Sequence, residues 1–361
     1  IKACTHDARI GIDDFDRWMM DMKSGSNVIG IVAPAVAANF EDEYLNINGW
    51  LKSLGVRAIF DVSFGAELTV KSYLNHIKNN VPDCVIAQPC PAIVTYIQIY
   101  KTELIKYLAP ADSPMTHTTK MIKNYYPQFE HSKILIVSPC LAKKREFDEV
   151  KIGDYNVTMK KIKEYLTEKS IMLSQFPKVD YDNPPAERAV LFSTPGGLMR
   201  TAEREFPGAE NITRKIEGPE IIYDYLNHLN KNIMDKKAPL LIDCLNCDMG
   251  CNGGTGTVQD KTVDEAEYYV EKISHEMQEK YKSSFSKKPS LRKIRKTVNS
   301  FWKENIYSRS YLDLSSNYKD KIKTPNENEL KKIYENMLKF NKEDFRNCSA
   351  CGYNPCENMA T

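Results

Sequence analysis

The sequence contains no apolar run that approaches the length of a membrane span, and it has no excess of charge of either sign. Its 361 residues include 50 basic and 48 acidic side chains, so we expect neither a membrane nor a nucleic-acid partner. Lysines in residues 286–298 and 317–332 alternate with acidic residues, which is typical of solvated helical surfaces. The sequence has no positively charged start followed by an apolar stretch, so nothing in it indicates export.

Histidine is also scarce, and the six histidines show no clustered metal spacing. Neither an internal repeat nor a low-complexity tract is present. Cysteine is the residue that remains for metal chemistry. The ten cysteines lie mostly in motifs of the metal-binding type, which indicates a reducing cytoplasm rather than a disulfide framework.

Four of these cysteines stand in three short motifs, each with a proline or glycine nearby. Cys90 lies in AQPCPAIV, Cys140 lies in ILIVSPCLAKKREF, and Cys247 and Cys251 lie in CLNCDMGCNGGTGT. Four thiolates suit an iron-sulfur cube or zinc. A structural zinc site usually takes its ligands as close pairs from a compact module, whereas two ligands here come singly. We therefore prefer iron-sulfur.

Short apolar runs, each ending near a glycine, proline or cysteine, predict buried parallel strands; they are residues 28–36, 56–63, 84–88, 133–138, 189–193 and 239–243. Helical patterns between them, such as 41–54, 68–79, 93–108 and 216–232, give the alternation of an α/β fold. Because ligands in such sheets gather at the carboxyl ends of strands, where the cysteine motifs fall, the metal centre is expected there.

We expect two lobes, each with a mostly parallel sheet flanked by helices and with the metal centre between them, followed by a helical C-terminal extension. The predicted segments are residues 1–25, 26–130 and 131–260, then 261–345 with helices at 263–281 and 327–340, and finally 346–361.

The three motifs, in this order, resemble the catalytic H-cluster domain of the FeFe hydrogenases. The resemblance is carried by Gln88-Pro89-Cys90-Pro91, by Pro139-Cys140 with Lys143, and by Cys247 to Cys251 with Gly253 and Gly254. It extends over about residues 28 to 257 through Ala33-Pro34-Ala35, Phe64 to Thr69, Ser113-Pro114 and Pro195-Gly196-Gly197.

This resemblance implies a six-iron H-cluster, in which a 4Fe-4S cube is bridged to a two-iron unit with carbon monoxide, cyanide and dithiolate ligands. Cys90, Cys140, Cys247 and Cys251 would bind the cube, and Cys251 would bridge to the two-iron unit. Lys143 would hold one cyanide and Ala33, Pro34 and Ala35 the other. The implied activity is the reversible interconversion of molecular hydrogen with protons and electrons, with ferredoxin as electron partner and with maturation proteins to build the centre.

The proton relay of the family is absent from this sequence. Pro89 stands where relatives have a relay cysteine, and Ala109, Tyr73 and His76 occupy the outer relay positions. Glu67, Tyr73 and His76 are the candidate substitutes. Ser138 and Leu245 replace methionines that flank the two-iron unit, while Cys84 and Cys244 match no ligand position and are expected to be core thiols.

Both ends of the chain resemble incomplete cluster regions. Cys4 resembles the end of a ferredoxin-type cysteine run, and Cys348, Cys351 and Cys356 resemble a further 4Fe-4S motif, with a zinc knuckle as the alternative. Such additional clusters would carry electrons. Two rival functions remain open: a hydrogen sensor of low turnover with the same centre, and an iron-sulfur assembly or carrier protein that holds only cubes.

Overall fold

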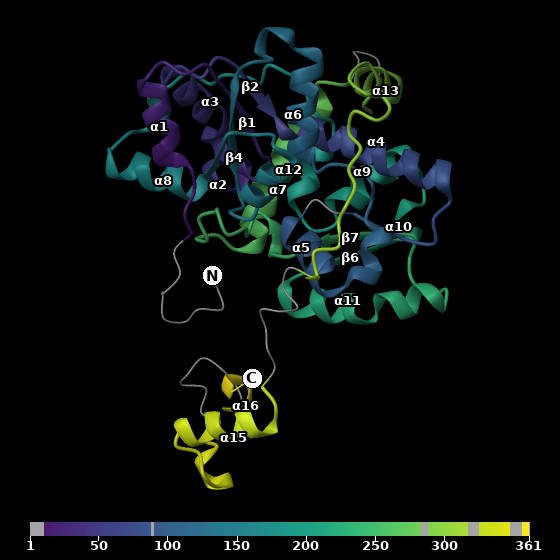
Figure 1. The fold of residues 1–361 in the computed structure, drawn as a ribbon. Coiled ribbons are helices and arrows are strands. Elements are labelled where there is room, and N and C mark those ends of the chain that lie inside the picture. The colour runs from purple at the N-terminus through teal and green to yellow at the C-terminus, as the bar shows by residue number, and fades with distance from the viewer. Residues whose placement is uncertain (1–10, 88–89, 283–287, 317–324, 347–355, 361) are drawn as a thin grey trace. The chain divides into compact units, whose positions relative to one another are not determined.

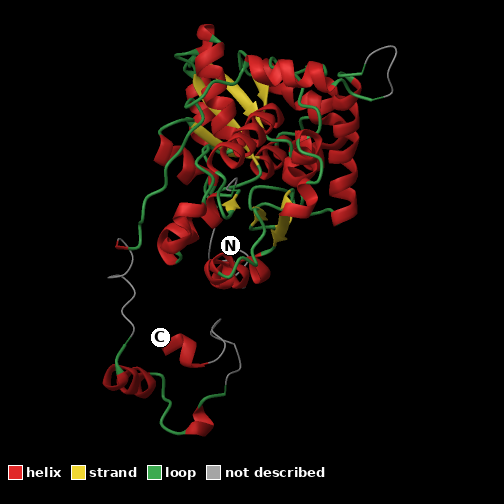
Figure 2. Cartoon of the chain, turned by 90° about the vertical axis from the view of Figure 1, so that its right-hand side faces the viewer, coloured by secondary structure: helices red, strands yellow, loops and turns green. Residues whose placement is uncertain are grey.

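The computed structural model describes residues 11–87, 90–282, 288–316, 325–346 and 356–360. They fall into two compact units, one of residues 12–312 and one that combines residues 1–11 with 313–361. The first unit contains both sheets and the four central cysteines. Within it the helices surround the sheets (Figure 1, Figure 2).

Two separate parallel sheets organise residues 12–312. The larger sheet has the order β2-β1-β4-β5, with strands Ile59–Asp61, Val28–Val32, Lys133–Ser138 and Tyr155–Thr158. The smaller sheet has the order β3-β7-β6, with strands Val85–Ile86, Leu241–Leu245 and Thr213–Glu217. All strand pairs in both sheets are parallel, so the predicted α/β class with parallel sheets flanked by helices is confirmed. A short strand, β8 (Asp248–Cys251), follows β7.

Helices connect and cover these strands; their bounds are α1 Phe15–Lys23, α2 Val36–Phe40, α3 Tyr44–Ser53, α4 Val62–Asn80, α5 Pro91–Tyr100, α6 Pro114–Tyr125, α7 Lys143–Val150, α8 Met159–Glu168, α9 Gly197–Glu205, α10 Ala209–Ile212, α11 Pro219–Met234, α12 Val263–Glu279 and α13 Leu291–Ser300. Short 3-10 helices are η1 Glu41–Glu43, η2 Thr102–Tyr107, η3 Pro127–Phe129, η4 Leu173–Gln175 and η5 Ala189–Ser193. The second unit contains α15 Glu327–Asn336, η6 Lys342–Asp344 and α16 Cys356–Ala360. No helix among the described residues is both long and apolar enough to cross a membrane.

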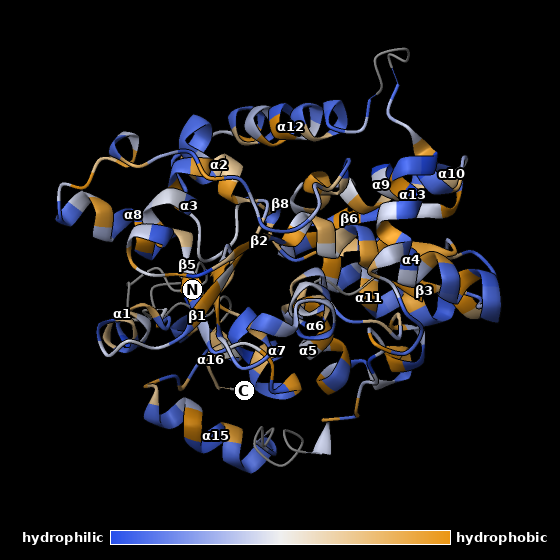
Figure 3. Ribbon diagram, turned by 90° about the horizontal axis from the view of Figure 1, so that it is seen from above, coloured by the Kyte–Doolittle hydropathy of each residue, from blue (hydrophilic) through white to orange (hydrophobic). Residues whose placement is uncertain are grey.

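The strands of the larger sheet are buried on both faces. All five residues of β1 are buried, and the register pairs Val28 with Lys133 and Val32 with Val137. Figure 3 shows β1 in the colour of hydrophobic residues, with polar residues on the outer turns of the helices. A parallel strand covered on both faces reads as an unbroken apolar run, which is why the sequence revealed β1 and β4.

The predicted strand at 189–193 is wrong, because these residues form η5. The amide of Leu191 donates to the carbonyl of Arg188 at 2.9 Å, and the amide of Thr194 donates to that of Leu191 at 2.8 Å. All five residues are buried, so the apolar run carried no periodicity that could separate strand from helix. The sequence also missed β6, whose residues are half-buried or exposed and partly charged.

The division between the sheets does not coincide with the division predicted at residue 130. The larger sheet takes β1 and β2 from before that point and β4 and β5 from after it, and the smaller sheet pairs β3 with β7. Helix α1 packs on the larger sheet: Asp14 accepts a hydrogen bond from the amide of Asn156 at 3.0 Å, and the rings of Trp18 and Trp50 lie 6.1 Å apart.

Candidate metal centre

The turn that carries Cys140 begins at the carboxyl end of β4 and is closed by a side chain. Ser138 Oγ accepts from the amide of Cys140 at 3.0 Å and donates to its carbonyl at 3.1 Å. Asn156 Nδ2 donates to the same carbonyl at 3.1 Å. Ser138 therefore holds the turn that presents the Cys140 thiol.

The glycines after Cys251 bring the third motif against this turn. The amide of Gly256 donates to the carbonyl of Pro139 at 2.8 Å, and the amide of Leu141 donates to Thr255 Oγ1 at 3.1 Å. A Cβ atom at Gly254 would lie 2.3 Å from the carbonyl oxygen of Pro139, so only glycine permits this approach. The close approach joins the second and third cysteine motifs.

Cys90 lies at the N-cap of α5, just beyond the carboxyl end of β3 in the smaller sheet. Tyr223 of α11 lies near both Cys90 and Cys247, since burial and then these two thiols raise the pKa of its phenol. Its hydroxyl donates to Asn246 Oδ1 at 2.5 Å. Sequence reasoning missed Tyr223, whose place in a helical run gave no signal.

Electrostatic interactions show that the four thiols lie near one another. Burial raises the pKa of Cys251 well above its ordinary value of 9.0, and the thiols of Cys247, Cys90 and Cys140 raise it further. Burial and then Cys90 raise the pKa of Cys140, while Lys143 opposes both shifts. The raised pKa values favour the protonated thiols of Cys140 and Cys251 in the metal-free protein, so metal binding there would release protons.

A single metal ion and an iron-sulfur cube need different spacings of the four thiols. Within the described residues, no three histidine, cysteine or acidic side chains lie close enough to hold one metal ion. Four sulfurs around one zinc would lie only about 4 Å apart, given Zn–S bonds near 2.3 Å. In a cube each thiolate binds a different iron atom, so a cube accepts thiols that lie farther apart than those around one zinc ion.

Beside Cys251 lies a small and mostly apolar pocket of about 50 Å³. It brings together the predicted residues Ala33, Pro34 and Ala35 with Lys143 and Cys251. Three other lining residues, Ala66, Pro114 and Pro139, belong to motifs that carried the family resemblance. Sequence reasoning did not single out the remaining four as site residues: Val62, Met115, Phe192 and Ser193. The segments that follow β1 and β4 and the last residue of β8 therefore meet at one place.

Lys143 is buried at the start of α7, with 7% of its side chain exposed. Its Nζ lies 2.5 Å from Glu146 Oε2, and Arg309 donates to Glu146 Oε1 at 2.9 Å. Thr116 Oγ1 also donates to this carboxylate, at 3.2 Å. Burial alone would raise the pKa of Glu146, but Lys143 and Arg309 lower it below its ordinary value. The carboxylate is ionised and holds the lysine ammonium at the pocket.

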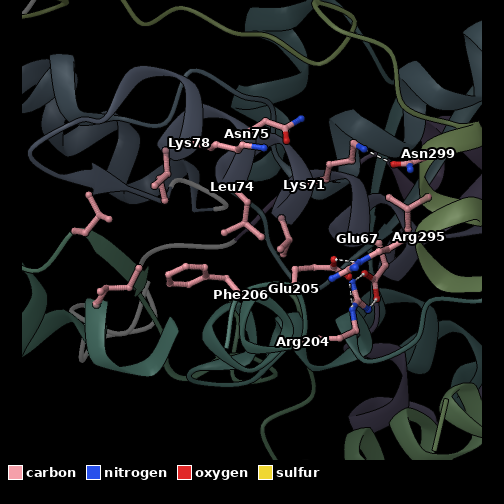
Figure 4. Close-up of a pocket in the computed structure, with 15 residues that line it drawn as sticks. Glu67, Lys71, Leu74, Asn75, Lys78, Arg204, Glu205, Phe206, Arg295 and Asn299 are labelled. Atoms are coloured by element: carbon pink, nitrogen blue, oxygen red, sulfur yellow. Dashed lines mark hydrogen bonds and ion pairs between the residues drawn. The ribbon is translucent and has the colours of Figure 1, made fainter. Parts of the chain in front are cut away.

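Glu67, a predicted proton carrier, lines a different cavity of about 580 Å³ (Figure 4). Arg204 donates to both of its carboxylate oxygens, at 2.9 and 2.6 Å. The amides of Glu187 and Ala189 donate to Glu67 Oε1 at 3.1 and 3.3 Å. With both oxygens engaged, Glu67 positions the backbone that leads into η5, and the geometry does not support the relay role.

The other relay candidates also lie outside the pocket lining. His76 is half-buried near the end of α4, where its Nδ1 lies 3.1 Å from Asn80 Nδ2, and burial lowers its pKa. Tyr73 and Ala109 are buried in the core. Pro89, Cys4, Cys348 and Cys351 lie outside the described residues, and Cys356 is buried in the second unit.

Cys84 and Cys244 lie in a hydrophobic cluster behind the smaller sheet. The Cys244 thiol donates to the carbonyl of Ala87 at 3.3 Å, and burial raises the pKa of Cys84 to about 12. Both therefore behave as core thiols.

Two buried polar side chains near Cys251 fit a bound inorganic group. Both amide atoms of Asn252, and Oγ of Ser193, are buried without a hydrogen-bond partner among the described residues. Buried polar groups in proteins are almost always paired. Four thiols, a buried ammonium and these unpaired groups form a donor set suited to a cube with an adjoining anionic unit.

Comparison with known sequences gives a consistent family. A model described as the iron only hydrogenase large subunit, C-terminal domain, matches residues 26–255. Iron hydrogenase 1 of Clostridium pasteurianum is 25% identical over 232 residues, which are 56% of this chain and 40% of that protein. Nuclear prelamin A recognition factor of Mus musculus is 29% identical over 131 residues, 31% of this chain and 28% of that protein. The chain spans less than half the length of these relatives.

Solved structures share the fold. An apo FeFe-hydrogenase variant from Chlamydomonas reinhardtii gives a TM-score of 0.63 at 16% identity, covering 84% of this chain and 99% of that one. A structure that revealed stepwise H-cluster assembly in an FeFe-hydrogenase gives a TM-score of 0.59 at 17% identity, with the same coverage.

Proposed function

The chain belongs to the family of the iron-only hydrogenase large subunit, C-terminal domain, and on this premise we propose that it interconverts molecular hydrogen with protons and electrons at a six-iron H-cluster. The observation that carries the proposal is the pocket in which Cys251, Lys143 and residues 33–35 meet beside the other three thiols. A protein that held only a cube would not need a buried ammonium in an apolar pocket next to it.

In this proposal Cys90, Cys140, Cys247 and Cys251 bind the cube, and Cys251 also bridges to the two-iron unit. When bound, the H-cluster supplies the redox chemistry and the iron position at which hydrogen reacts. The polypeptide supplies the ligands, a dry pocket and fixed hydrogen-bond donors.

Lys143 is the donor to an iron-bound cyanide. An ammonium makes a charge-assisted hydrogen bond to an anionic acceptor, and the bond is stronger where water is excluded. Glu146 and Arg309 fix the lysine, so it need not reorganise when the centre is loaded. Ala33, Pro34 and Ala35 hold the second cyanide through the backbone and small side chains.

Proton delivery is the step in which this chain departs from its relatives. Ala109 and the buried Tyr73 stand at outer relay positions but cannot take over the roles of the family's relay carboxylates and hydroxyl. The carboxylate of Glu67 is hydrogen-bonded to Arg204. These observations favour a second candidate, a hydrogen sensor with the same centre and low turnover. The two candidates differ in turnover rate per loaded centre, measured with a redox dye.

Electrons would be exchanged with ferredoxin through additional 4Fe-4S clusters, for which Cys4 and the set Cys348, Cys351 and Cys356 are the proposed ligands. Loading would require hydrogenase maturation proteins and an anaerobic, reducing cytoplasm, in which buried thiols remain unoxidised.

The test is hydrogen turnover by protein matured anaerobically and measured with a redox dye. Cys251→Ala is expected to abolish turnover, because the bridge between the two parts of the centre loses its thiolate. Cys244→Ala is the matched control: it removes a buried thiol seven residues away, and we expect turnover to persist at a cost of about 1 kcal/mol in stability. Turnover at the unmodified rate in Cys251→Ala would contradict the proposal.

A further inference from the structure

Ser193 is the residue of the pocket whose chemistry the proposed function leaves unexplained. It lines the pocket together with Lys143 and Cys251, and 2% of its surface is exposed. Lys143 is already paired with Glu146. Among the described side chains that line the pocket, Ser193 alone carries a buried polar atom without a hydrogen-bond partner.

The position of Ser193 is fixed from two sides. It ends η5, whose first amide donates to Glu67 and whose turn is closed by the amide of Thr194. On the other side it meets the strand that carries Cys251: a Cβ atom at Gly250 would lie 2.6 Å from the carbonyl oxygen of Ser193. Only glycine allows this approach, so the hydroxyl is held beside the proposed bridging cysteine.

A hydroxyl is one donor and an acceptor, and burying it without a partner destabilises the protein. The remaining walls offer mostly alkyl and aromatic groups, from Ala33, Val62, Met115 and Phe192 among others. In the loaded protein, where the bound group fills the pocket, this group would supply the partner of the hydroxyl. The oxygen of its iron-bound carbon monoxide, the nitrogen of its cyanide and the sulfurs of its dithiolate can each accept a hydrogen bond.

We propose that Ser193 Oγ donates a hydrogen bond to an acceptor atom of the two-iron unit, an inference that rests on the proposed function. The bond withdraws electron density from the iron atoms and stabilises their reduced form. Ser193 thus adds a protein donor to the unit, besides Lys143.

The experiment compares Ser193→Ala with the unmodified protein by infrared spectroscopy after identical maturation. We expect carbon monoxide and cyanide bands in both, with at least one band shifted by more than its width in Ser193→Ala. Ser132→Ala is the matched control, because Ser132 Oγ is also buried and unpaired but lies before β4, at the opposite end of that strand from the pocket. Its bands should coincide with those of the unmodified protein.

Bands that do not move in Ser193→Ala would overturn the inference and leave the proposed function standing. Bands missing from the unmodified, iron-loaded protein would overturn the proposed function and the inference with it. Ser193→Thr keeps the hydroxyl and should keep the original band positions if Ser193→Ala loads poorly; a shift as large as that of alanine would also overturn the inference.

Thermal unfolding of the metal-free protein supplies the second readout. Because the hydroxyl bonds to nothing within the protein, the unfolding midpoint of Ser193→Ala should be unchanged or higher than that of the unmodified chain. A lower midpoint would assign the hydroxyl to the fold and contradict the inference.

Discussion

Lys143 shows how a residue that would be exposed in most sequences becomes part of a buried site. It lies in a KKRE string, and its neighbour Lys144 is half exposed, with 42% of its side chain accessible. Lys143 instead turns inward to Glu146, three residues later on the same face of α7. The sequence indicated a role for Lys143 only through the resemblance of its motif to that of the family. It could not predict Arg309, which is 163 positions from Glu146.

The thiol groups predict opposite effects of pH on the empty and loaded protein. Burial keeps the pKa of Cys251 above its ordinary value of 9.0 in the folded, metal-free state. The folded state therefore binds protons more tightly than the unfolded chain, and this stability is complete below about pH 9 and is lost as pH rises. Cluster binding needs thiolates, so it strengthens over the same range.

The measurement is the unfolding midpoint of the metal-free protein between about pH 8 and pH 10. It should fall with pH, and the fall should be smaller in Cys251→Ala, which lacks the titrating group. Cys356→Ala, which removes a thiol of the other compact unit, is the control. An equal fall in Cys251→Ala and in the unmodified chain would refute the assignment of the raised pKa.

At the scale of elements, Glu67 links α4 to both α9 and η5. Glu67 of α4 binds Arg204 of α9 and also accepts the amides that precede and begin η5. Sequence reasoning treated Glu67 as a proton carrier because its motif lies beside the site. The partner, 137 residues away, decides its role, and no local pattern reveals it.

Replacing Glu67 with glutamine should therefore destabilise the fold rather than only slow proton transfer. We expect a loss of about 3 kcal/mol, near the lower end for breaking a buried pair, because Arg204 keeps Glu187 at 3.1 Å. Glu205→Gln is the control, since its side chain also binds Arg204 but is 20% exposed, and it should cost about 1 kcal/mol or less. The measurement is the free energy of unfolding of each metal-free variant in denaturant. Equal losses in Glu67→Gln and Glu205→Gln would contradict this prediction.

A second prediction at this scale concerns the segment after α13, which lies beyond the family match at residues 26–255. Its Arg309 bonds Glu146 and Glu149 and stacks on Tyr311, with 7% of its side chain exposed. In Arg309→Gln, Glu146 loses one of two cations and draws Lys143 more strongly. We expect a cyanide band to shift, whereas the exposed Arg292→Gln should leave all bands in place. Identical spectra for both variants would show that Arg309 does not act on Lys143.

The strands show what a sequence can reveal about elements. Apolar runs revealed β1 and β4, which are buried on both faces, but the same kind of run at 189–193 is a 3-10 turn. Polar β6 gave no apolar signal, although its five residues pair with β7 in parallel register. Whether an apolar run becomes a strand, and whether a polar segment pairs into a sheet, depends on contacts in the complete fold that the local sequence does not contain.

For the whole molecule, residues 12–312 contain both sheets, the four thiols and the pocket, while residues 313–361 belong to the other compact unit. The motifs predicted the site because each follows a parallel strand, where chain ends converge. The motifs could not predict that each of the two sheets combines strands from before and after residue 130.

Ending the chain after Leu312 tests this division. The shortened protein should keep its infrared bands and its dye-coupled turnover, because it retains Arg309 and the whole pocket. Turnover with reduced ferredoxin should fall, since Cys348, Cys351 and Cys356 are removed. Loss of the bands, with the sheet content unchanged by circular dichroism, would show that residues beyond 312 support the centre.

The most direct test of the central claim is infrared spectroscopy of the anaerobically matured protein, with iron content measured on the same sample. The account predicts bands of iron-bound carbon monoxide and cyanide that are present in the unmodified protein, retained in Cys244→Ala and absent from Cys251→Ala. Protein that binds iron and sulfide at cube stoichiometry but shows no such bands after maturation would contradict the hydrogenase assignment and would indicate a carrier of cubes alone.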